Sequence, residues 1–353
     1  MCVDSNYQNL VKKILDEGYF YDDPNREGVQ RLEIPSYTFR HDFKDGFPAI
    51  TLKKLAFKSV TTELIWFLRG DTNIKYLVDN GCNIWNKDAY GYYLKAYTKG
   101  VEKPYTFKEF IQIIKNFNIP QDHPAGSKGL GSLDKVYGHY WRNFNGVDQI
   151  KQLIDDMINK PMSSELLVVA RDPSHKEEQA LPCCHYGFQI VMRPLNKKER
   201  QEELEKYYPT SEGIASIEDE WVDFVPKYGF ELHWKQRSVD TFLGLPFNIA
   251  SYAELALTLQ ALTGHKALAI QGDLKKVHLY DNSIEKAKEL VTRECSIEHV
   301  KLLVKDEFYY LTDESIAGKV SIDDLFNAMK PDWFKLEGYN PQPPMRVEML
   351  SRT

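Results

Sequence analysis

The chain has 353 residues, of which 42% are hydrophobic and 27% are charged. This composition is typical of a folded globular protein and excludes a largely disordered or fibrous chain. The formal net charge of -6 argues against a general nucleic-acid-binding protein, because such proteins attract phosphates with a positive field.

We find no pattern that predicts secretion, a membrane span or a metal centre. The opening residues 1–6 are polar, and no apolar run is long enough to cross a bilayer. The five cysteines lack the spacing of zinc ligands or of a C-x-x-C redox pair. We therefore expect reduced thiols, no metal site and a cytoplasmic protein that binds neither nucleic acid nor a membrane.

The N-terminal part of the chain predicts two amphipathic helices separated by a loop. In residues 7–15 apolar side chains recur at helical spacing, and Gly18 follows as a stop signal. Residues 22–28 are rich in turn-forming residues and predict an exposed loop. Residues 57–69 repeat the helical spacing and predict the second helix.

The rest of the chain reads as one α+β domain with two surface insertions, at about residues 90–130 and 194–232. The first insertion is predicted to hold a short helix at 107–117, and charge-dense residues 197–220 suggest a solvated second insertion. Apolar runs predict buried strands, and breaker-free stretches predict helices. The expected strands are 165–170, 189–192 and 266–271, and the expected helices are 247–262 and 284–293, the latter opened by a capping box of Asn282 and Glu285.

Residues 180–189, with the sequence ALPCCHYGFQ, contain two adjacent cysteines followed by a histidine. A cysteine is a nucleophile only as its thiolate, which requires nearby positive charge or hydrogen-bond donors. Buried cysteines more often act as small apolar side chains. The stretch is therefore a candidate catalytic site only if another segment supplies the positive charge.

Residues 236–252 contain suitable groups in a compact apolar context. Arg237 and Ser238 are suited to binding a phosphate, and Asp240 adds a carboxylate. Asn248 can donate and accept a hydrogen bond at once, which matches the O4/N3 edge of uracil. The alternative is that these polar groups only begin a helix.

The two stretches, with five further motifs in matching order, resemble the thymidylate synthase family. That family includes the pyrimidine nucleotide hydroxymethylases of some bacteriophages. The further motifs are 63–76 (ELIWFLRGDTNIKY), 84–85 (IW), 136–142 (VYGHYWR), 278–280 (HLY) and 338–341 (GYNP). The matching segments span roughly two-thirds of the chain, and so many ordered motifs agree by chance far more rarely than one short motif.

The resemblance implies a fold, substrates and an assembly. The fold would be a single thymidylate synthase-like domain over residues 1–353, with a large mixed β-sheet at a dimer interface covered by helices. The substrate would be dUMP, and 5,10-methylenetetrahydrofolate would be the co-substrate. The protein would be a homodimer in which each phosphate site borrows arginines from the partner subunit.

The resemblance also implies catalytic roles for five side chains. Cys184 would add to C6 of the pyrimidine, so that C5 attacks the methylene carbon of the folate. Asn248 would hold the uracil edge and stabilise the developing enolate. Glu63 and His185 would relay protons near O4, and Tyr137 would assist removal of the C5 proton.

A further set of residues would bind the two substrates. At the nucleotide these are Arg26, Arg237 and Ser238 for the 5′-phosphate, His278 and Tyr280 for the 3′-hydroxyl, and Gln189 in the pocket wall. At the folate they are Asp240 for the pterin, Trp85 as an apolar wall and Lys53 toward the anionic tail. For Tyr137 and Gln189 a structural role is an equally good interpretation.

The chain departs from the family at the arginines expected from the partner subunit. Where the family has Ser-Arg-Arg, this chain has Ser163-Ser164-Glu165. A hydroxyl and a carboxylate thus replace two cations, and a carboxylate repels phosphate. Arg171 and Lys135 are candidate replacements, and their spacing does not choose between them.

A second departure concerns the folate end of the site. A second tryptophan expected there is Asp88, and residues 346–353 form a longer tail with a polar end. A looser closure admits water, which would add to the methylene on C5 in place of a hydride. We therefore expect a phage dUMP hydroxymethylase that makes 5-hydroxymethyl-dUMP in the host cytoplasm. The alternatives are a divergent thymidylate synthase making dTMP and dihydrofolate, and a non-catalytic nucleotide-binding member of the fold.

Overall fold

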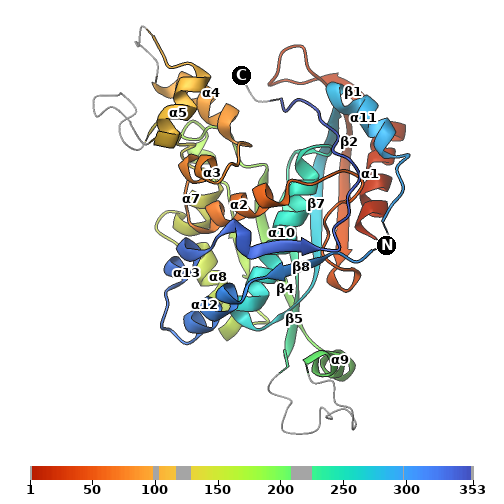
Figure 1. Ribbon diagram of the computed structural model, residues 1–353, viewed down its shortest axis with the longest axis vertical. Helices are drawn as coiled ribbons and strands as arrows, with labels where there is room; N and C mark the ends of the chain where they lie inside the picture. Colours follow the sequence, from red (N-terminus) through yellow and green to blue (C-terminus); the bar gives the residue numbers. More distant parts are fainter. Residues whose placement is uncertain (1, 98–102, 117–128, 208–224, 297, 351–353) are drawn as a thin grey trace.

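The computed structural model describes residues 2–97, 103–116, 129–207, 225–296 and 298–350. Its centre is a seven-stranded sheet in the order β1-β2-β7-β5-β4-β3, with β6 beside β7 (Figure 1). The strands are β1 (Tyr19–Asp22), β2 (Gln30–Asp42), β3 (Leu167–Val169), β4 (His185–Pro194), β5 (Tyr228–Gln236), β6 (Val239–Asp240) and β7 (Lys266–Tyr280). β7 pairs parallel with β5 and β6, and the remaining pairs are antiparallel, so the sheet is mixed.

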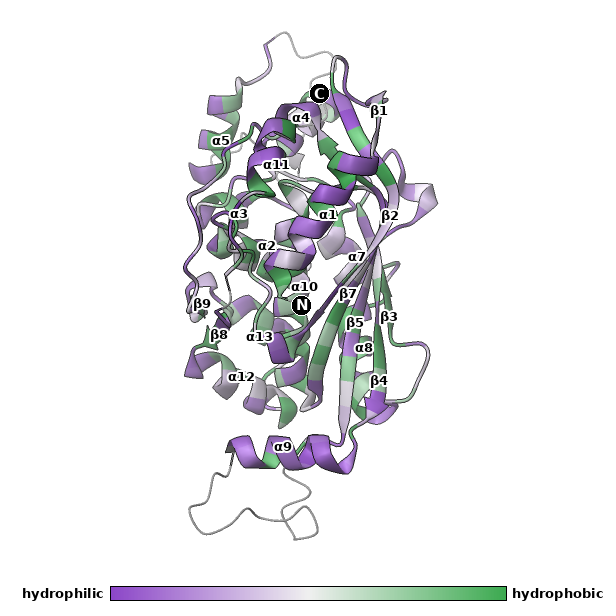
Figure 2. Ribbon diagram, turned by 90° about the vertical axis from the view of Figure 1, so that its right-hand side faces the viewer, coloured by the Kyte–Doolittle hydropathy of each residue, from purple (hydrophilic) through white to green (hydrophobic). Residues whose placement is uncertain are grey.

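The helices lie mainly on one side of this sheet (Figure 2). Against the sheet packs α10 (Gly244–Thr263), which also contacts α2 (Phe57–Leu68). The other helices are α1 (Val3–Glu17), α3 (Lys75–Asp79), α4 (Asn86–Tyr97), α5 (Phe107–Asn116), α7 (Tyr137–Asn143), α8 (Gln149–Asn159), α9 (Lys197–Tyr207), α11 (Ile284–Leu290), α12 (Asp306–Ile316) and α13 (Ile322–Ala328). A separate antiparallel pair consists of β8 (Lys301–Val304) and β9 (Phe334–Glu337).

The two faces of the sheet differ in composition. In β5 the side chains of Phe230, Leu232 and Trp234 are buried against the helices, while those of Glu231 and His233 alternate with them on the other face. This alternation follows from the two-residue period of a strand. The outward face also carries the exposed apolar side chains of Leu167 and Val191.

Most elements predicted from apolar spacing are confirmed. The helices expected at 57–69, 107–117 and 247–262 are α2, α5 and α10, and the first amphipathic stretch is α1. The strand expected at 165–170 is the shorter β3, and those expected at 189–192 and 266–271 lie within β4 and β7, of which β7 is much longer than predicted at 15 residues. The mixed α+β architecture agrees with the predicted fold class. In the described part of the chain no helix combines the length and hydropathy that a membrane span requires.

The charge-dense segment follows β4 and precedes β5, as predicted for an insertion between strands. Its residues 197–207 form the mostly exposed helix α9, which the sequence analysis did not foresee. Ion pairs of Glu199 with Arg193 and of Glu203 with Lys266, both at 2.6 Å, attach α9 to the sheet. The rest of that segment, 208–224, lies outside the described residues.

The predicted capping box is wrong. α11 follows Ser283 without a side-chain cap, and Asn282 instead donates to the carbonyl of Glu348 at 3.0 Å.

Candidate active site

The nucleophile candidate lies beside a guanidinium from a distant segment. Cys184 directly precedes β4, and its carbonyl accepts from the backbone N–H of Arg237 at 2.9 Å. The guanidinium of Arg237 donates to the carbonyls of Cys183 and Pro182, and its Nη2 lies 3.8 Å from Sγ of Cys184. This is the positive charge that a nucleophilic cysteine requires nearby. The two motifs singled out in the sequence therefore meet.

The neighbouring thiol has a different environment. Cys183 is fully buried, and burial raises the pKa of its thiol far above the ordinary value. Cys184 is only half-buried. The structure thus distinguishes a packed cysteine from an accessible one at adjacent positions.

Tyr137 contacts both residues of the Cys-His pair. Its hydroxyl accepts from the backbone N–H of Cys184 at 2.9 Å, and its ring stacks on His185 with centroids 4.0 Å apart. The next residue, Gly138, touches the backbone of Asp71 so closely that a Cβ would collide with it. This close approach fixes the position of the start of α7 and therefore that of Tyr137.

His185 is held as a neutral imidazole. Its Nδ1 hydrogen-bonds the hydroxyl of Tyr252 on α10 at 2.8 Å, and burial lowers the pKa of His185 to about 3. Below that pH the ring would be protonated, so it is uncharged at physiological pH. The sequence did not single out Tyr252, because helical spacing alone marks it only as a core aromatic.

Glu63 and Asn248 each have a fixed partner. Oε1 of Glu63 accepts from the indole N–H of Trp85 at 2.6 Å, and burial raises the pKa of Glu63 to about 7. A carboxyl that titrates near neutral pH can both give and take a proton. Oδ1 of Asn248 accepts from Nε2 of Gln236 at 3.0 Å, which holds the carboxamide in one orientation.

A cavity of about 430 Å³ adjoins these groups at the start of α10. Five predicted residues line it: Lys53, Glu63, Trp85, Asp240 and Asn248. Leu243, Phe247 and Met345 add apolar walls, and Asp88 lies where a second tryptophan was expected. A mainly apolar cavity with a carboxylate and a lysine suits a flat heterocycle that carries N–H donors and an anionic tail, as a folate does.

Lys53 and Asp240 lie close enough to influence one another. Oδ1 of Asp240 accepts from the backbone N–H groups of Phe242 and Leu243, both at 3.1 Å. The ammonium of Lys53 donates to the carbonyl of Phe242 and lies 4.4 Å from its ring. Burial lowers the pKa of Lys53 to about 8, while Asp240 opposes that shift. Lys53 is therefore a lining residue of the cavity and not a solvated surface charge.

His278 and Tyr280 lie on β7 beside β2. Nδ1 of His278 donates to the carbonyl of Lys276 at 2.8 Å, and its buried Nε2 has no hydrogen-bond partner among the described residues. The imidazole is thus prepared to accept a hydrogen bond from a bound hydroxyl. Arg26 and Arg31 lie over the ring of Tyr280, at 5.2 and 5.3 Å from its centroid.

Arg31 and Asp23 are site residues that the sequence analysis missed. Oδ2 of Asp23 accepts from Nε of Arg31 at 2.7 Å and from Nη1 of Arg26 at 3.2 Å. One buried carboxylate therefore fixes two guanidinium groups beside Tyr280. The register of β2 on β7, which pairs Arg31 with Tyr280, was not visible in a single sequence.

The positions of the absent arginines lie on the outward side of the sheet. Ser164 and Glu165 are exposed, and Nε2 of Gln189 donates to the carbonyl of Ser164 at 3.1 Å. Gln189 is therefore not among the residues that line the 430 Å³ cavity. Of the two proposed replacements, Lys135 is paired with Glu178 at 2.6 Å, and Arg171 is exposed.

The described part of the C-terminal tail covers the cavity. Met345, Val347 and Met349 line it, and three side chains bind the tail backbone. Arg26 donates to the carbonyl of Leu350 at 3.0 Å, Lys87 to that of Met349 at 3.4 Å, and Asn282 to that of Glu348. The tail is held closed up to residue 350, and the polar residues 351–353 lie outside the described residues.

Comparison with known proteins decides the family. A family model described as thymidylate synthase matches residues 5–351. The chain belongs to the thymidylate synthase family. As a member, it is a folate-dependent enzyme that transfers a one-carbon unit to C5 of a pyrimidine nucleotide, with 5,10-methylenetetrahydrofolate as co-substrate.

Relatives of this family resemble the chain over nearly its whole length. A thymidylate synthase of Malacoplasma penetrans is 36% identical over 289 residues, covering 82% of this chain and 85% of the relative. One of Mycoplasma genitalium is 35% identical over 90% of this chain and 91% of the relative. A probable thymidylate synthase of Escherichia phage T5 is 33% identical over 96% and 98%.

Proposed function

We propose that this enzyme is a thymidylate synthase, which converts dUMP and 5,10-methylenetetrahydrofolate into dTMP and dihydrofolate. The observation that carries the proposal is the accessible Cys184 thiol beside Arg237, next to an apolar cavity that the tail covers. The relatives named above support the methyl product. This choice replaces the hydroxymethylase expected from the sequence with its first alternative.

The first step would be addition of the Cys184 thiolate to C6 of the bound pyrimidine. The S–C6 bond forms, and the electron pair of the C5–C6 double bond moves toward O4 as an enolate. Arg237 would stabilise the thiolate before attack. The carboxamide of Asn248, oriented by Gln236, would bind the uracil edge and the enolate.

The protons would be handled by Glu63 and Tyr137. Because burial raises the pKa of Glu63 to about 7, it can protonate O4 and later take that proton back. Burial also raises the pKa of Tyr137 well above its usual value, so its hydroxyl remains protonated. Tyr137 would therefore assist removal of the C5 proton by holding the proton-accepting group in place, and would not accept the proton itself. His185 would contribute as a neutral hydrogen-bonding group.

The folate end would exclude water from C5. The folate supplies the methylene carbon and then the hydride that reduces it to methyl, after which Cys184 leaves C6. Trp85 and the tail residue Met345 form the apolar wall there, with Asp240 for the N–H groups of the pterin and Lys53 for an anionic group. A dry wall protects the methylene from hydration.

A homodimer is part of the proposal. The outward face of the sheet carries the exposed apolar side chains of Leu167 and Val191, and the register of β3 on β4 places them on the same side as Gln189. Ser164, which precedes β3 in the chain, lies at the same edge of the sheet. A second copy on this face would bury these side chains, and Arg31 would supply within each subunit a cation that the family takes from the partner.

The second candidate is the hydroxymethylase, and the specific feature in its favour is Asp88 in the cavity wall. A carboxylate there can hold a water close to the reacting carbon.

A product assay by mass spectrometry, with dUMP, UMP and dCMP offered in parallel, distinguishes the two candidates. We expect dTMP from dUMP, with one dihydrofolate formed per turnover. Formation of 5-hydroxymethyl-dUMP without dihydrofolate would replace the proposal with the second candidate.

A covalent trap tests the nucleophile separately. The wild-type enzyme should form a stable adduct with 5-fluoro-dUMP and the folate, because fluorine at C5 cannot leave as a proton does. Cys184→Ser should abolish the adduct, whereas Cys183→Ser, the matched control one residue away, should retain it. Absence of an adduct from the wild-type protein would indicate a non-catalytic nucleotide-binding member of the fold.

A further inference from the structure

Two segments that are far apart in the sequence line the 430 Å³ cavity proposed for the folate, which we name the folate cavity. Lys53 and Leu55 line it from the loop before α2, and Pro344 and Met345 line it from the start of the C-terminal tail. Neither segment belongs to a helix or strand at these positions. Their places relative to one another must therefore be fixed by contacts other than those of regular secondary structure.

Proline limits how the tail segment can be held. Residues 340–344 have the sequence NPQPP, and a proline has no backbone N–H to donate. Gln342 supplies two donors, since its backbone N–H donates to the carbonyl of Thr51 and its Nε2 to that of Glu294, both at 2.8 Å. Any further anchoring must use the carbonyls of the segment as acceptors. A side chain that donates to one of these carbonyls therefore contributes directly to the position of the tail.

Arg293 donates to both segments at once. Its Nη1 donates to the carbonyl of Leu52 at 2.7 Å and to the carbonyl of Pro343 at 2.9 Å. Leu52 directly precedes Lys53, and Pro343 directly precedes Pro344. Because Nη1 carries two N–H groups, this one nitrogen can serve both acceptors. A single guanidinium thus joins the two segments next to the residues that line the cavity.

The guanidinium is itself held in place. Nη2 of Arg293 donates to Oε1 of Glu289 at 2.8 Å, and the side chain is only 14% exposed. The backbone N–H of Arg293 donates to the carbonyl of Leu290 in α11 at 3.1 Å, and its carbonyl accepts from Nε2 of Gln8 in α1 at 2.8 Å. These two helices therefore fix the guanidinium before a folate binds. Its hydrogen bonds are also stronger than those of a neutral donor, because it is charged.

We propose that Arg293 is a positioning residue of the folate site. It is not among the described residues that line the cavity, so it would act by holding Lys53 and the start of the tail at a fixed separation. The inference rests on the proposed function, since it assigns the cavity to the folate. With both hydrogen bonds in place, the folate would bind to a site that is already formed, and the tail would close in the position that keeps water from C5.

Arg293→Met tests the proposal, because methionine keeps an apolar stem and removes every donor. With saturating dUMP, we expect the KM for 5,10-methylenetetrahydrofolate to rise roughly tenfold and kcat to fall by less than about threefold. Part of the product should be 5-hydroxymethyl-dUMP, because a displaced tail admits water. Dihydrofolate, which has no methylene to transfer, should bind to the dUMP-bound variant roughly tenfold more weakly in calorimetry. An unchanged folate KM or an unchanged dihydrofolate affinity would overturn the proposal.

Two further variants identify the contacts that matter. Arg293→Lys should recover part of the lost folate affinity, because an ammonium can still donate to a carbonyl. Glu289→Gln removes the charge paired with Arg293 but neither carbonyl contact, and it should change the folate KM by less than about threefold. A Glu289→Gln variant as impaired as Arg293→Met would assign the effect to that ion pair and overturn the proposal.

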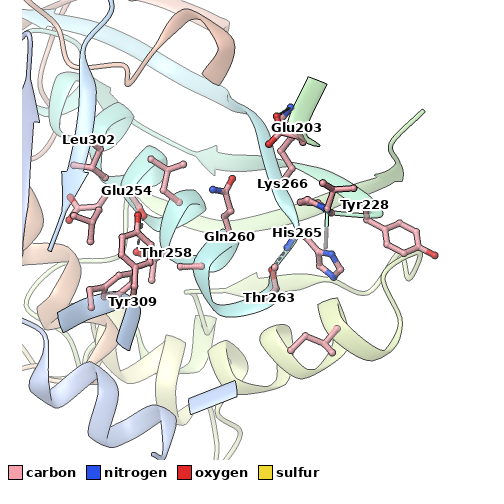
Figure 3. A pocket seen from close by; sticks show the side chains of 18 of the residues that line it. Glu203, Tyr228, Glu254, Thr258, Gln260, Thr263, His265, Lys266, Leu302 and Tyr309 are labelled. Carbon is pink, nitrogen blue, oxygen red and sulfur yellow. Dashed lines mark hydrogen bonds and ion pairs between the residues drawn. The ribbon is translucent and has the colours of Figure 1, made fainter. Parts of the chain in front are cut away.

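Gln260→Ala separates positioning from a general loss of stability. Gln260 lies in the second half of α10, beside Glu254 and Thr258, at a second cavity of about 790 Å³ (Figure 3). Among the described residues, none lines both this cavity and the folate cavity. Oε1 of Gln260 accepts from the backbone N–H of Ala267 at 2.9 Å, so the variant should have a lower melting temperature and an unchanged folate KM. A rise in KM like that of Arg293→Met would show that any loss of stability is sufficient, and would overturn the proposal.

The two proposals fail in different ways. A wild-type enzyme that forms no product from dUMP and the folate would overturn the proposed function, and the role of Arg293 with it. An active wild-type enzyme whose folate KM equals that of Arg293→Met would overturn only the role of Arg293.

Discussion

Burial, more than neighbouring charge, sets the protonation state of single residues in this enzyme. Desolvation lowers the pKa of His185 to about 3 and raises that of Glu63 to about 7. The same cause raises the pKa of Glu254 to about 8, far from the active site. The buried imidazole of His185 is therefore neutral, which suits it to hydrogen bonding. The buried carboxyl of Glu63 has a pKa near physiological pH, which suits it to proton transfer.

The raised pKa of Glu254 makes the free energy of unfolding depend on pH. Between the ordinary pKa of a glutamate and about 8, the unfolded chain ionises at this position while the folded protein remains protonated, so the folded state loses stability as pH rises. Glu254→Gln removes this loss. We expect the stability of the variant relative to wild type to increase by about 2–3 kcal/mol from pH 5 to pH 7.5, measured by urea unfolding. A difference that stays constant with pH would contradict the assignment.

At the same scale, we predict that Arg31 binds the nucleotide. It is fixed by Asp23 beside Arg26 and Tyr280, so its removal should weaken nucleotide binding without altering the chemistry at Cys184. We expect Arg31→Ala to raise the KM for dUMP roughly tenfold and to change kcat by less than about threefold. Lys13→Ala, which removes a positive charge from the exposed side of α1, should leave both constants unchanged. A fall in kcat alone would show that Arg31 does not bind the nucleotide.

Among the elements, we propose that the C-terminal tail links the two substrate sites. Arg26, a proposed phosphate ligand, donates to the carbonyl of Leu350, while Met345 and Met349 line the cavity proposed for the folate. We therefore expect binding of the nucleotide phosphate at Arg26 to influence how the tail closes over the folate.

Truncation after Pro344 tests the role of this element. Loss of the buried apolar wall should raise the KM for the folate at least roughly tenfold, given about 1.5–3 kcal/mol for each large apolar side chain buried. The open site should also form some 5-hydroxymethyl-dUMP, because water reaches the methylene. Lys87→Ala removes only the contacts to Glu348 and Met349 and should give a smaller effect in steady-state kinetics. A truncated enzyme with unchanged folate KM would exclude a closing role for the tail.

At the scale of the whole molecule, the helices lie mainly on one side of the sheet (Figure 2), and its other face carries exposed apolar side chains. Leu167 and Val191 are 43% and 45% exposed on the latter face. Exposed apolar groups on a sheet of this size are typical of a subunit interface. Ser164, whose carbonyl accepts from Gln189, lies at the same edge, so we expect assembly and the composition of the proposed phosphate site to be connected.

Charges on this face should separate the subunits. In analytical ultracentrifugation we expect wild type to sediment as a dimer and the double variant Leu167→Asp and Val191→Asp to sediment as a monomer. Ile316→Asp alters an apolar side chain that is 58% exposed on α12, away from the sheet, and should remain dimeric. A double variant that stays dimeric would move the interface to another surface.

Local patterns in the sequence predicted several of the elements and the two motifs that meet in the structure. Helical spacing located α1 and α2, a breaker-free stretch located α10, and the ordered motifs pointed to Cys184, Arg237 and Asn248. Such features depend on residues that are contiguous or a few positions apart, which is why one sequence reveals them. The same reasoning did not find that residues 197–207 form a helix, because α9 has little apolar periodicity and depends on ion pairs to Arg193 and Lys266.

Tertiary structure decided which side chains meet and what their surroundings do to them. Arg31 reaches Tyr280 through the β2–β7 register, Tyr252 reaches His185 from α10, and Glu254 is left with an unpaired oxygen between α10 and α2. Arg31, for example, is 8 residues from Asp23 in the chain and 249 residues from Tyr280. Burial and long-range pairing exist only once the chain has folded, so neither they nor the pKa values that they set can be read from local sequence.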